Sequence, residues 1–298
     1  MNRKLEKLLL LFLCAVMLLP ALPAFAVDVD YETEVTEEDT KGIVNVLLLG
    51  TDDRIPNTKD KGRADCIIIA SFNKSTGDIK LISIERAIYI DIPNVGKDLI
   101  TYAHSYGGPE MMVDLIEKNF NIDLAGYCEV DFQQFINIID TLCGVDITLT
   151  EPEETGLNGL WNELCPDNVA LTMHDMVEGE NHLDGYDALM YCRLRCIDSD
   201  WYRIERQRNL IQAVLDTALD FDLQHNITAV KAILPYVDTN LSARDICALI
   251  ACVGKFTGTI ADQMSVPVKT ERIDCDYAAE SIRIHDFIYG APKTENAE

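Results

Sequence analysis

Long apolar runs and shorter mixed segments alternate along this chain, and their spacing predicts both strands and helices. The run IVNVLLLG at 43–50 is apolar almost throughout and indicates a buried strand. The runs at 66–73 and 78–85 predict two strands joined by the turn KSTG, which is typical of a hairpin. Residues 145–150 and 264–269 predict two further strands.

Helical patterns separate these strands, and the expected helices cover 109–120, 131–144, 184–191, 203–220 and 241–255. Pro109 suits a first helical turn, Asp131 and Ser242 suit N-caps, and Gly144 suits a helix end. The longest helix carries an apolar stripe formed by Ile204, Ile211, Leu215 and Ala218. Residues 151–178 show no such pattern, and an irregular excursion is expected there.

The mixture of strands and helices, without internal repeats, predicts a single layered α/β domain over 43–275. Residues 27–42, VDVDYETEVTEEDTKG, are acidic and lack apolar periodicity, so they indicate a tether. Residues 276–298 are expected to form a C-terminal tail.

The first 26 residues indicate export. Arg3, Lys4 and Lys7 precede a long apolar run, and the segment ends in the small-residue cleavage pattern Ala24-Phe25-Ala26. The apolar stretch is also long enough to span a bilayer, so residues 1–26 are either a cleaved signal peptide or a signal-anchor. In both cases the rest of the chain lies outside the cytoplasmic membrane.

The composition narrows the function further. The chain has 25 Lys and Arg against 50 Asp and Glu, a formal net charge of −25, which argues against nucleic acid as a partner. None of the ten cysteines forms a C-x-x-C pair, so their spacing indicates no metal site, and we assign no disulfide. Phosphate-binding P-loops, serine-hydrolase elbows and zinc-protease motifs are absent from the sequence.

Charged residues nevertheless gather at the predicted ends of strands and helices. Asp52 follows the first strand, Arg63 and Asp65 precede the second, and Arg86 follows the third. The stretch 191–208, YCRLRCIDSDWYRIERQR, adds five arginines, namely Arg193, Arg195, Arg203, Arg206 and Arg208. Spacings of three and four place Arg203, Arg206 and Gln207 on one side at the start of a helix.

Guanidinium groups at a helix start are suited to a phosphate, because the free N–H groups of the first turn add to their charge. Nearby Asp52 and Asp65 could hold a divalent cation, Mg²⁺ or Mn²⁺, against that phosphate. Pyrophosphate fits this combination better than a carboxylate or sulfate. The alternative is that each arginine pairs with the abundant acidic residues, as is plausible for Arg54 and Arg208.

The ordered segments resemble those of the LytR-CpsA-Psr family, over roughly 45–215. The resemblance is carried by NVLLLGTDDR, GRADCIIIASFNKSTGDIKLISIER, YAHSYGGPE, GVDIT, LDGYDALMYCRLR and DSDWYRIERQR. It implies a three-layer α-β-α sandwich with a central mixed β-sheet and a polyprenyl chain in a hydrophobic pocket. It also implies extracytoplasmic transfer of anionic glycopolymers, such as teichoic acid or capsule, from a polyprenyl-pyrophosphate carrier to peptidoglycan in Gram-positive bacteria.

The resemblance also assigns roles to residues of this chain. Asp52 and Asp65 match the Mg²⁺-associated aspartates of the family. Asp200 stands where a general base lies in some members, and we expect Arg86 and Arg195 to act with it in catalysis. The matching phosphate-binding residues are Arg63, Arg86, Arg193, Arg195, Arg203 and Arg206, with Gln207 beside them.

This chain departs from the family at one motif. The usual S-I-P-R-D is Ser83-Ile84-Glu85-Arg86-Ala87 here, so the arginine is kept but its acidic neighbour is lost. Activity could therefore be altered, and two alternatives stay open: a polyprenyl-phosphate-binding regulatory module, and a pyrophosphate hydrolase that uses water as acceptor. His104 in YAHSYGG is interpreted as a hydrogen-bonded structural residue.

Overall fold

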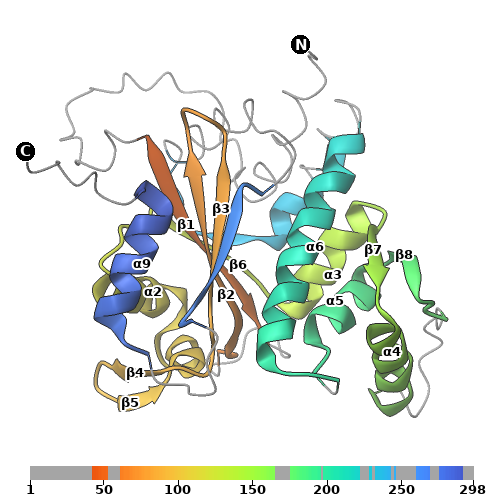
Figure 1. Cartoon of the computed structure of the whole chain (residues 1–298), viewed down its shortest axis with the longest axis horizontal. Coiled ribbons are helices and arrows are strands. Elements are labelled where there is room, and N and C mark those ends of the chain that lie inside the picture. Colours follow the sequence, from red (N-terminus) through yellow and green to blue (C-terminus); the bar gives the residue numbers. More distant parts are fainter. Residues whose placement is uncertain are drawn as a thin grey trace, which may run out of the picture.

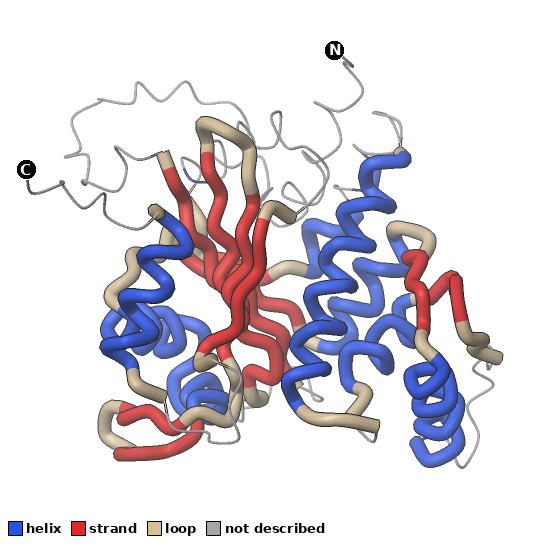
Figure 2. Tube along the Cα trace, in the orientation of Figure 1, coloured by secondary structure: helices blue, strands red, loops and turns tan. Residues whose placement is uncertain are grey.

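The computed structural model describes residues 42–52, 61–164, 175–195, 197–221, 228–229, 232–242, 245, 260–268 and 275–290. Within them, helices cover both faces of a central six-stranded sheet, so the predicted α-β-α sandwich is confirmed (Figures 1 and 2). In spatial order the strands are β10 (Asp262–Val266), β3 (Ile79–Ile84), β2 (Ala64–Asn73), β1 (Ile43–Thr51), β6 (Gly126–Val130) and β9 (Asp238–Thr239). The sheet is mixed, because β1 pairs parallel to β6 and β3 parallel to β10, whereas the other neighbours are antiparallel.

The expected hairpin of β2 and β3 is confirmed, and its turn is fastened by Asn73. The Asn73 side-chain oxygen accepts the backbone N–H groups of Ser75 and Thr76 at 2.9 and 3.1 Å. On its other side β2 pairs with β1 as far as Gly50, where the register shifts so that Thr51 faces Ala64. This irregularity falls at the end of β1 that leads to the candidate site.

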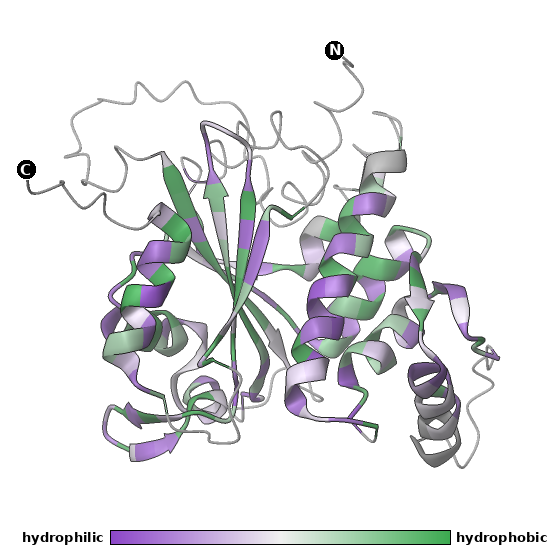
Figure 3. Ribbon diagram, in the orientation of Figure 1, coloured by the Kyte–Doolittle hydropathy of each residue, from purple (hydrophilic) through white to green (hydrophobic). Residues whose placement is uncertain are grey.

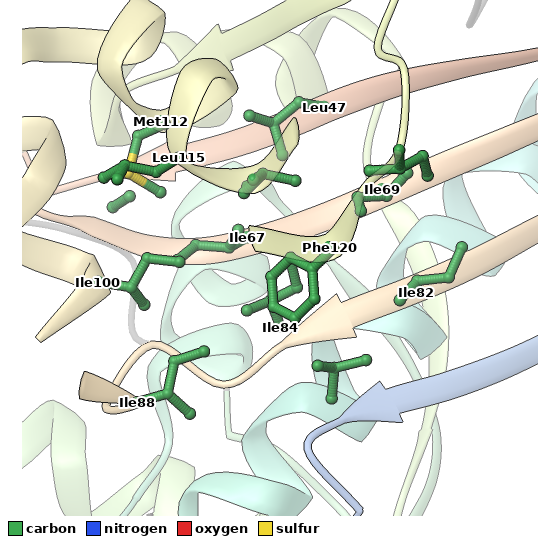
Figure 4. Packing of buried hydrophobic residues seen from close by; sticks show 14 of the residues in the cluster. Leu47, Ile67, Ile69, Ile82, Ile84, Ile88, Ile100, Met112, Leu115 and Phe120 are labelled. Atoms are coloured by element: carbon green, nitrogen blue, oxygen red, sulfur yellow. The ribbon is translucent and has the colours of Figure 1, made fainter. Parts of the chain in front are cut away.

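One helical layer consists of α2 (Ile100–Phe120) and α9 (Tyr277–Tyr289), which pack on the same face of the sheet (Figure 1). Alternate residues of the strands point into this layer, among them Leu47, Ile67 and Ile82, while their neighbours point to the opposite face. Figure 4 shows these side chains meeting Met112, Leu115 and Phe120 of α2. Burial on both faces explains why β1 and β2 read as near-continuous apolar runs. Figure 3 shows green stretches along the strands of the sheet, interrupted by purple polar positions.

The other layer contains α3 (Phe132–Thr141), α5 (Gly185–Arg193) and α6 (Asp200–Asp220), all of which the sequence predicted. Asp131 caps α3, and together with Gln134 it forms a capping box. The α6 stripe is buried as expected: Ile204, Leu215 and Ala218 are at most 3% exposed. The start of α6 is buried around most of its circumference, which brings charged residues into the interior.

Two short hairpins and one helix lie outside the three layers. They are β4 (Tyr89–Ile92) with β5 (Gly96–Leu99), β7 (Val145–Leu149) with β8 (Gly179–Leu183), and α4 (Glu151–Leu164), while η3 (Leu234–Tyr236) precedes β9. The strand expected at 145–150 therefore exists as β7, and among the described strands it pairs with β8 alone. The prediction of irregular structure over 151–178 was wrong for 151–164, because these residues form α4.

The C-terminal boundary also differs from the sequence-based prediction. Residues 277–289 are not a tail but form α9, whose Ile284 and Ile288 are buried in the core against α2. The helix expected at 109–120 is confirmed, but α2 begins earlier, at Ile100, and kinks at Gly108 (φ 73°) before Pro109. Gly108 permits this kink because positive φ carries little strain without a Cβ.

Some predicted segments lie outside the described residues: 1–26, almost all of 27–42, Arg54, and most of the helix expected over 241–255. Among the helices that the structure does describe, none is long and apolar enough to cross a bilayer.

Candidate functional site

A cavity of about 450 Å³ lies between the sheet and the layer of α3, α5 and α6. Its walls are mainly apolar and come from β1, β2, α3 and α6, with Leu48, Ile68, Phe135, Leu210, Ile211 and Val214 among them. The same cavity is lined by charged and polar side chains, namely Asp52, Arg63, Asp65, Asp131, Arg193, Arg195, Arg203 and Gln207. An apolar body that adjoins a cluster of guanidinium groups suits a ligand with a lipid part and an anionic part.

Three cysteines, Cys66, Cys128 and Cys192, also line the apolar part of the cavity. Burial raises the pKa of Cys66 and of Cys128 to about 12, so both thiols stay neutral at physiological pH. They therefore act as small apolar wall residues.

The pairing of β1 with β2 brings the first charged group together. Because the two strands are antiparallel, the carboxyl end of β1 lies beside the amino end of β2, so Asp52 meets Arg63. Asp52 accepts the Arg63 backbone N–H at 2.5 Å and its Nη2 and Nε at 2.6 and 3.0 Å. This hydrogen bonding raises the pKa of Arg63 further. Asp52 thus fixes a permanently charged guanidinium at the cavity.

Gly50 makes the end of β1 fit. A Cβ at this position would lie 3.0 Å from the Cβ of Cys66 on the neighbouring strand, tighter than most Cβ contacts, so Cys66 would have to shift. The register shift after Gly50 then redirects the chain toward Asp52.

Two aspartates hold three further arginines in an alternating array. Asp65 lies 2.5 Å from Arg86 Nη1 and 3.9 Å from Arg195 Nη2. Asp200, the first residue of α6, lies 3.4 to 3.6 Å from Arg86, Arg195 and Arg203. Residues far apart in sequence therefore meet as predicted, and the contacts of Asp200 are long enough for phosphate oxygens to replace them.

Arg203 is the most deeply buried of these cations, at 2% exposure. Burial lowers its pKa, although Asp200 opposes the effect. Its Nε and Nη1 have no hydrogen-bond partner within the described part of the chain. Buried donors usually find acceptors, so a cationic side chain with spare N–H groups on a cavity wall favours an anion there.

Arg193, Arg195 and Gln207 complete the cavity lining, each in a different way. The Arg193 guanidinium stacks over the Phe132 ring at 4.5 Å, which joins the charged and the apolar parts of the wall. The Arg195 side chain is 42% exposed, more than those of Arg63, Arg86 and Arg203. Gln207 lies one turn after Arg203 on α6 and is largely buried.

Arg206 does not belong to this group, contrary to the sequence-based prediction. It does not line the cavity, and its guanidinium is used by the protein itself. Its Nε pairs with Glu153 of α4 at 3.0 Å, its Nη1 donates to the Leu194 carbonyl at 2.6 Å, and its Nη2 binds Asp198. Arg206 therefore fixes the segment that carries Arg195, and Glu153 lies in a helix that the sequence did not reveal.

His104 is a structural residue, as expected. It is fully buried, its Nδ1 lies 2.6 Å from the Gly62 carbonyl, and its Nε2 lies 3.1 Å from Glu129. Ser105 donates to the same carbonyl at 3.0 Å. The first half of α2 thus holds the backbone immediately before Arg63.

Asp52 and Asp65 are both on the cavity wall, where the sequence placed a cation. In the described residues no three His, Cys, Asp or Glu side chains gather as a metal site. Mg²⁺ often binds through one or two carboxylates and completes its shell with phosphate oxygens and water, so a cation at Asp52 and Asp65 stays a prediction.

Comparison with known proteins agrees with this arrangement. The model of the LytR_cpsA_psr family matches residues 24–286. The chain belongs to this family. Its relatives include the polyisoprenyl-teichoic acid–peptidoglycan teichoic acid transferases TagU of Oceanobacillus iheyensis, 32% identical over 223 residues, and TagT of Bacillus subtilis, 31% identical over 218 residues. These matches cover 72% and 70% of the chain but only 63% of each relative's length.

Solved structures support the fold. The family protein YwtF (TagT) with bound octaprenyl pyrophosphate lipid is 22% identical to this member of the LytR-CpsA-Psr family, with a TM-score of 0.59. The comparison covers 84% of this chain and 91% of that one. At this identity the likeness establishes a shared fold.

Proposed function

We propose that this protein is a phosphotransferase that moves an anionic glycopolymer from a polyprenyl-pyrophosphate carrier to peptidoglycan. The observation that carries the proposal is one cavity whose apolar body adjoins Arg63, Arg193, Arg195 and Arg203. A polyprenyl chain would occupy the apolar part, and the diphosphate would meet the guanidinium groups. The names of its TagU and TagT relatives support the same reaction.

The reaction requires an exchange of ion partners. The hydroxyl oxygen of an acceptor sugar attacks the phosphorus next to the glycopolymer, and the bond from that phosphorus to the bridging oxygen breaks. Polyprenyl phosphate leaves with the electron pair, while Asp200 takes the hydroxyl proton. Arg86 and Arg195, which lie 3.6 and 3.5 Å from Asp200, turn to the phosphate oxygens and stabilise their charge.

Arg203 holds the diphosphate from the interior of the cavity, and Arg63 holds it from the β1–β2 edge. Asp52 and Asp65 would hold a Mg²⁺ or Mn²⁺ ion, whose charge would further neutralise the diphosphate. No protein nucleophile is needed, since phosphoryl transfer depends mainly on alignment and charge neutralisation.

The reaction also requires an extracytoplasmic location, because peptidoglycan lies outside the cytoplasmic membrane. The signal-like residues 1–26 and the acidic segment 27–42 suit a domain at the outer face of the cytoplasmic membrane, or in the cell wall, of a Gram-positive bacterium. Nucleic acid is not a proposed partner, given the net charge of −25.

Ala87 favours the competing proposal of a lipid-binding module or hydrolase, since the family motif usually has an aspartate there. One experiment separates the three functions. The purified protein is incubated with a lipid-pyrophosphate-linked sugar and Mg²⁺, with and without a peptidoglycan acceptor. Sugar joined to the acceptor supports transfer, free phosphosugar supports hydrolysis, and tight lipid binding without either product supports the module.

The Arg195→Ala variant tests the mechanism itself. We expect it to retain the fold, because Arg195 is 42% exposed and makes only long ion pairs, but to lose transfer by roughly a hundredfold or more. Normal transfer by this variant would contradict the arrangement described above.

A further inference from the structure

Glu85 is a buried carboxyl group that the proposed reaction does not use. It follows β3, is 5% exposed, and occupies the position where the family motif usually has proline. Its backbone N–H donates to the Val266 carbonyl of β10 at 2.8 Å, and its Oε1 accepts the Ala87 N–H at 3.1 Å. Glu85 is therefore held in place on one side, independently of the arginine cluster.

The other carboxyl oxygen, Oε2, is buried and has no hydrogen-bond partner among the described residues. The charged groups that act on it are Asp200 and Arg203 from α6 and Arg86 from its own loop, while β10 contributes only a backbone carbonyl. The Nε atoms of Arg86 and Arg203 also lack hydrogen-bond partners in the described chain. A buried acceptor on Glu85 thus interacts electrostatically with two arginines whose donors are incompletely bonded.

These surroundings favour the neutral form of Glu85. Burial raises its pKa, and the charge of Asp200 adds to the effect, while Arg203 and Arg86 oppose it. A diphosphate at the same guanidinium groups would add at least two negative charges. It would thereby weaken the effect by which Arg203 and Arg86 lower the pKa of Glu85. Binding of the anion and protonation of Glu85 then favour each other, as linkage requires.

We propose that Glu85 is a positioning residue that couples diphosphate binding to the uptake of one proton from solvent. The ionised carboxylate attracts Arg86 and Arg203 away from the ligand, whereas the carboxylic acid leaves both guanidinium groups to the phosphate oxygens. Only an O–H bond at Glu85 forms in this step. The inference deepens the proposed function, since it rests on phosphate binding at these arginines.

Calorimetric titration with inorganic pyrophosphate and Mg²⁺ tests the coupling. Titrations in buffers of different ionisation enthalpy, repeated at a series of pH values above the ordinary glutamate pKa, give the number of protons taken up. We expect the wild type to take up more protons than Glu85→Gln, by as much as one. The affinity of the wild type for pyrophosphate, divided by that of Glu85→Gln, should also fall as the pH rises. The fall is up to roughly tenfold for each pH unit where binding takes up one proton. The titration of pyrophosphate itself cancels in this comparison.

Glu280→Gln is the matched control, because Glu280 is another buried acid, 6% exposed, but lies on α9 and pairs with Arg283. It should take up as many protons as the wild type. If wild type and Glu85→Gln bind pyrophosphate with equal proton uptake at every pH, the role of Glu85 is refuted while the phosphate site stands. If the folded wild type binds no pyrophosphate at any pH, both the phosphate site and this inference are refuted.

Discussion

Arg195 and Arg206 come from the same arginine-rich stretch, yet the structure gives them opposite roles, and a matched pair of substitutions tests this. Arg206 has a side chain 3% exposed and binds Glu153, Asp198 and the Leu194 carbonyl. Arg195 is 42% exposed, and its ion pairs are 3.5 and 3.9 Å long. Methionine at either position keeps much of the side-chain volume and removes the charge.

The two variants should differ mainly in stability. Arg206→Met leaves two largely buried carboxylates without a cation, and breaking such a buried pair costs about 3–5 kcal/mol. Arg195→Met removes only partly exposed contacts, which contribute about 0–1 kcal/mol. Transfer should respond in the opposite order for folded protein, because Arg195 touches the phosphate in the proposed reaction and Arg206 does not.

Urea unfolding followed by tryptophan fluorescence measures the first effect, and the transfer assay under stabilising conditions measures the second. Adding Glu153→Gln to Arg206→Met should recover part of the loss, because one orphaned charge disappears. A coupling energy of about 0.5–3 kcal/mol between the two sites would be typical. If Arg206→Met unfolds at the wild-type urea concentration but transfers no glycan, Arg206 binds phosphate and the structural assignment is wrong.

Three further changes separate parts of the site. Ile211→Trp fills the apolar part of the cavity and should abolish binding of a polyprenyl pyrophosphate, while inorganic pyrophosphate still binds in calorimetry. Equal loss of both ligands would contradict separate apolar and phosphate-binding parts of the cavity. Asp65→Asn should raise the Mg²⁺ concentration needed for pyrophosphate binding by at least roughly tenfold, and an unchanged Mg²⁺ titration would exclude Asp65 as a ligand. In the folded protein the pKa of Glu85 lies above its ordinary value of 4.5. The wild type therefore loses stability as the pH rises from 4.5 through the folded-state pKa. Glu85→Gln should therefore melt higher than the wild type at neutral pH but not near pH 4, and a constant difference in melting temperature would argue against this titration.

The sequence predicted the elements whose signals are local. The apolar runs of β1, β2 and β3 and the capping box of α3 need no distant partner to be recognised. By contrast, α4 contains Gly156 and Gly159, which weaken a helical pattern, and its contacts with α5, with the segment near Ile197 and with Arg206 of α6 come from distant parts of the chain. For α9, Asp276 as N-cap and the spacing of Ile284 and Ile288 were available signals that the sequence-based prediction did not use.

In the candidate site, too, some contacts follow from local sequence patterns and others depend on distant residues. Antiparallel pairing of neighbouring strands makes the meeting of Asp52 with Arg63 predictable from sequence. The choice between Arg203 and Arg206 is not, since both lie on one side of α6 and their roles depend on which distant acid each one meets. The unsatisfied oxygen of Glu85 likewise depends on packing between β3, β10 and α6.

The aspartates that organise the arginines also set a threshold for the ligand. Any anion that enters must compete with Asp65 and Asp200, which already pair with Arg86 and Arg195, closely only in the Asp65–Arg86 pair at 2.5 Å. In the proposed reaction, a diphosphate would carry enough charge to displace them, whereas the monophosphate that remains on the lipid would carry less. The two aspartates would then lower the affinity for the product and favour its release, which would leave the arginines paired again for the next lipid.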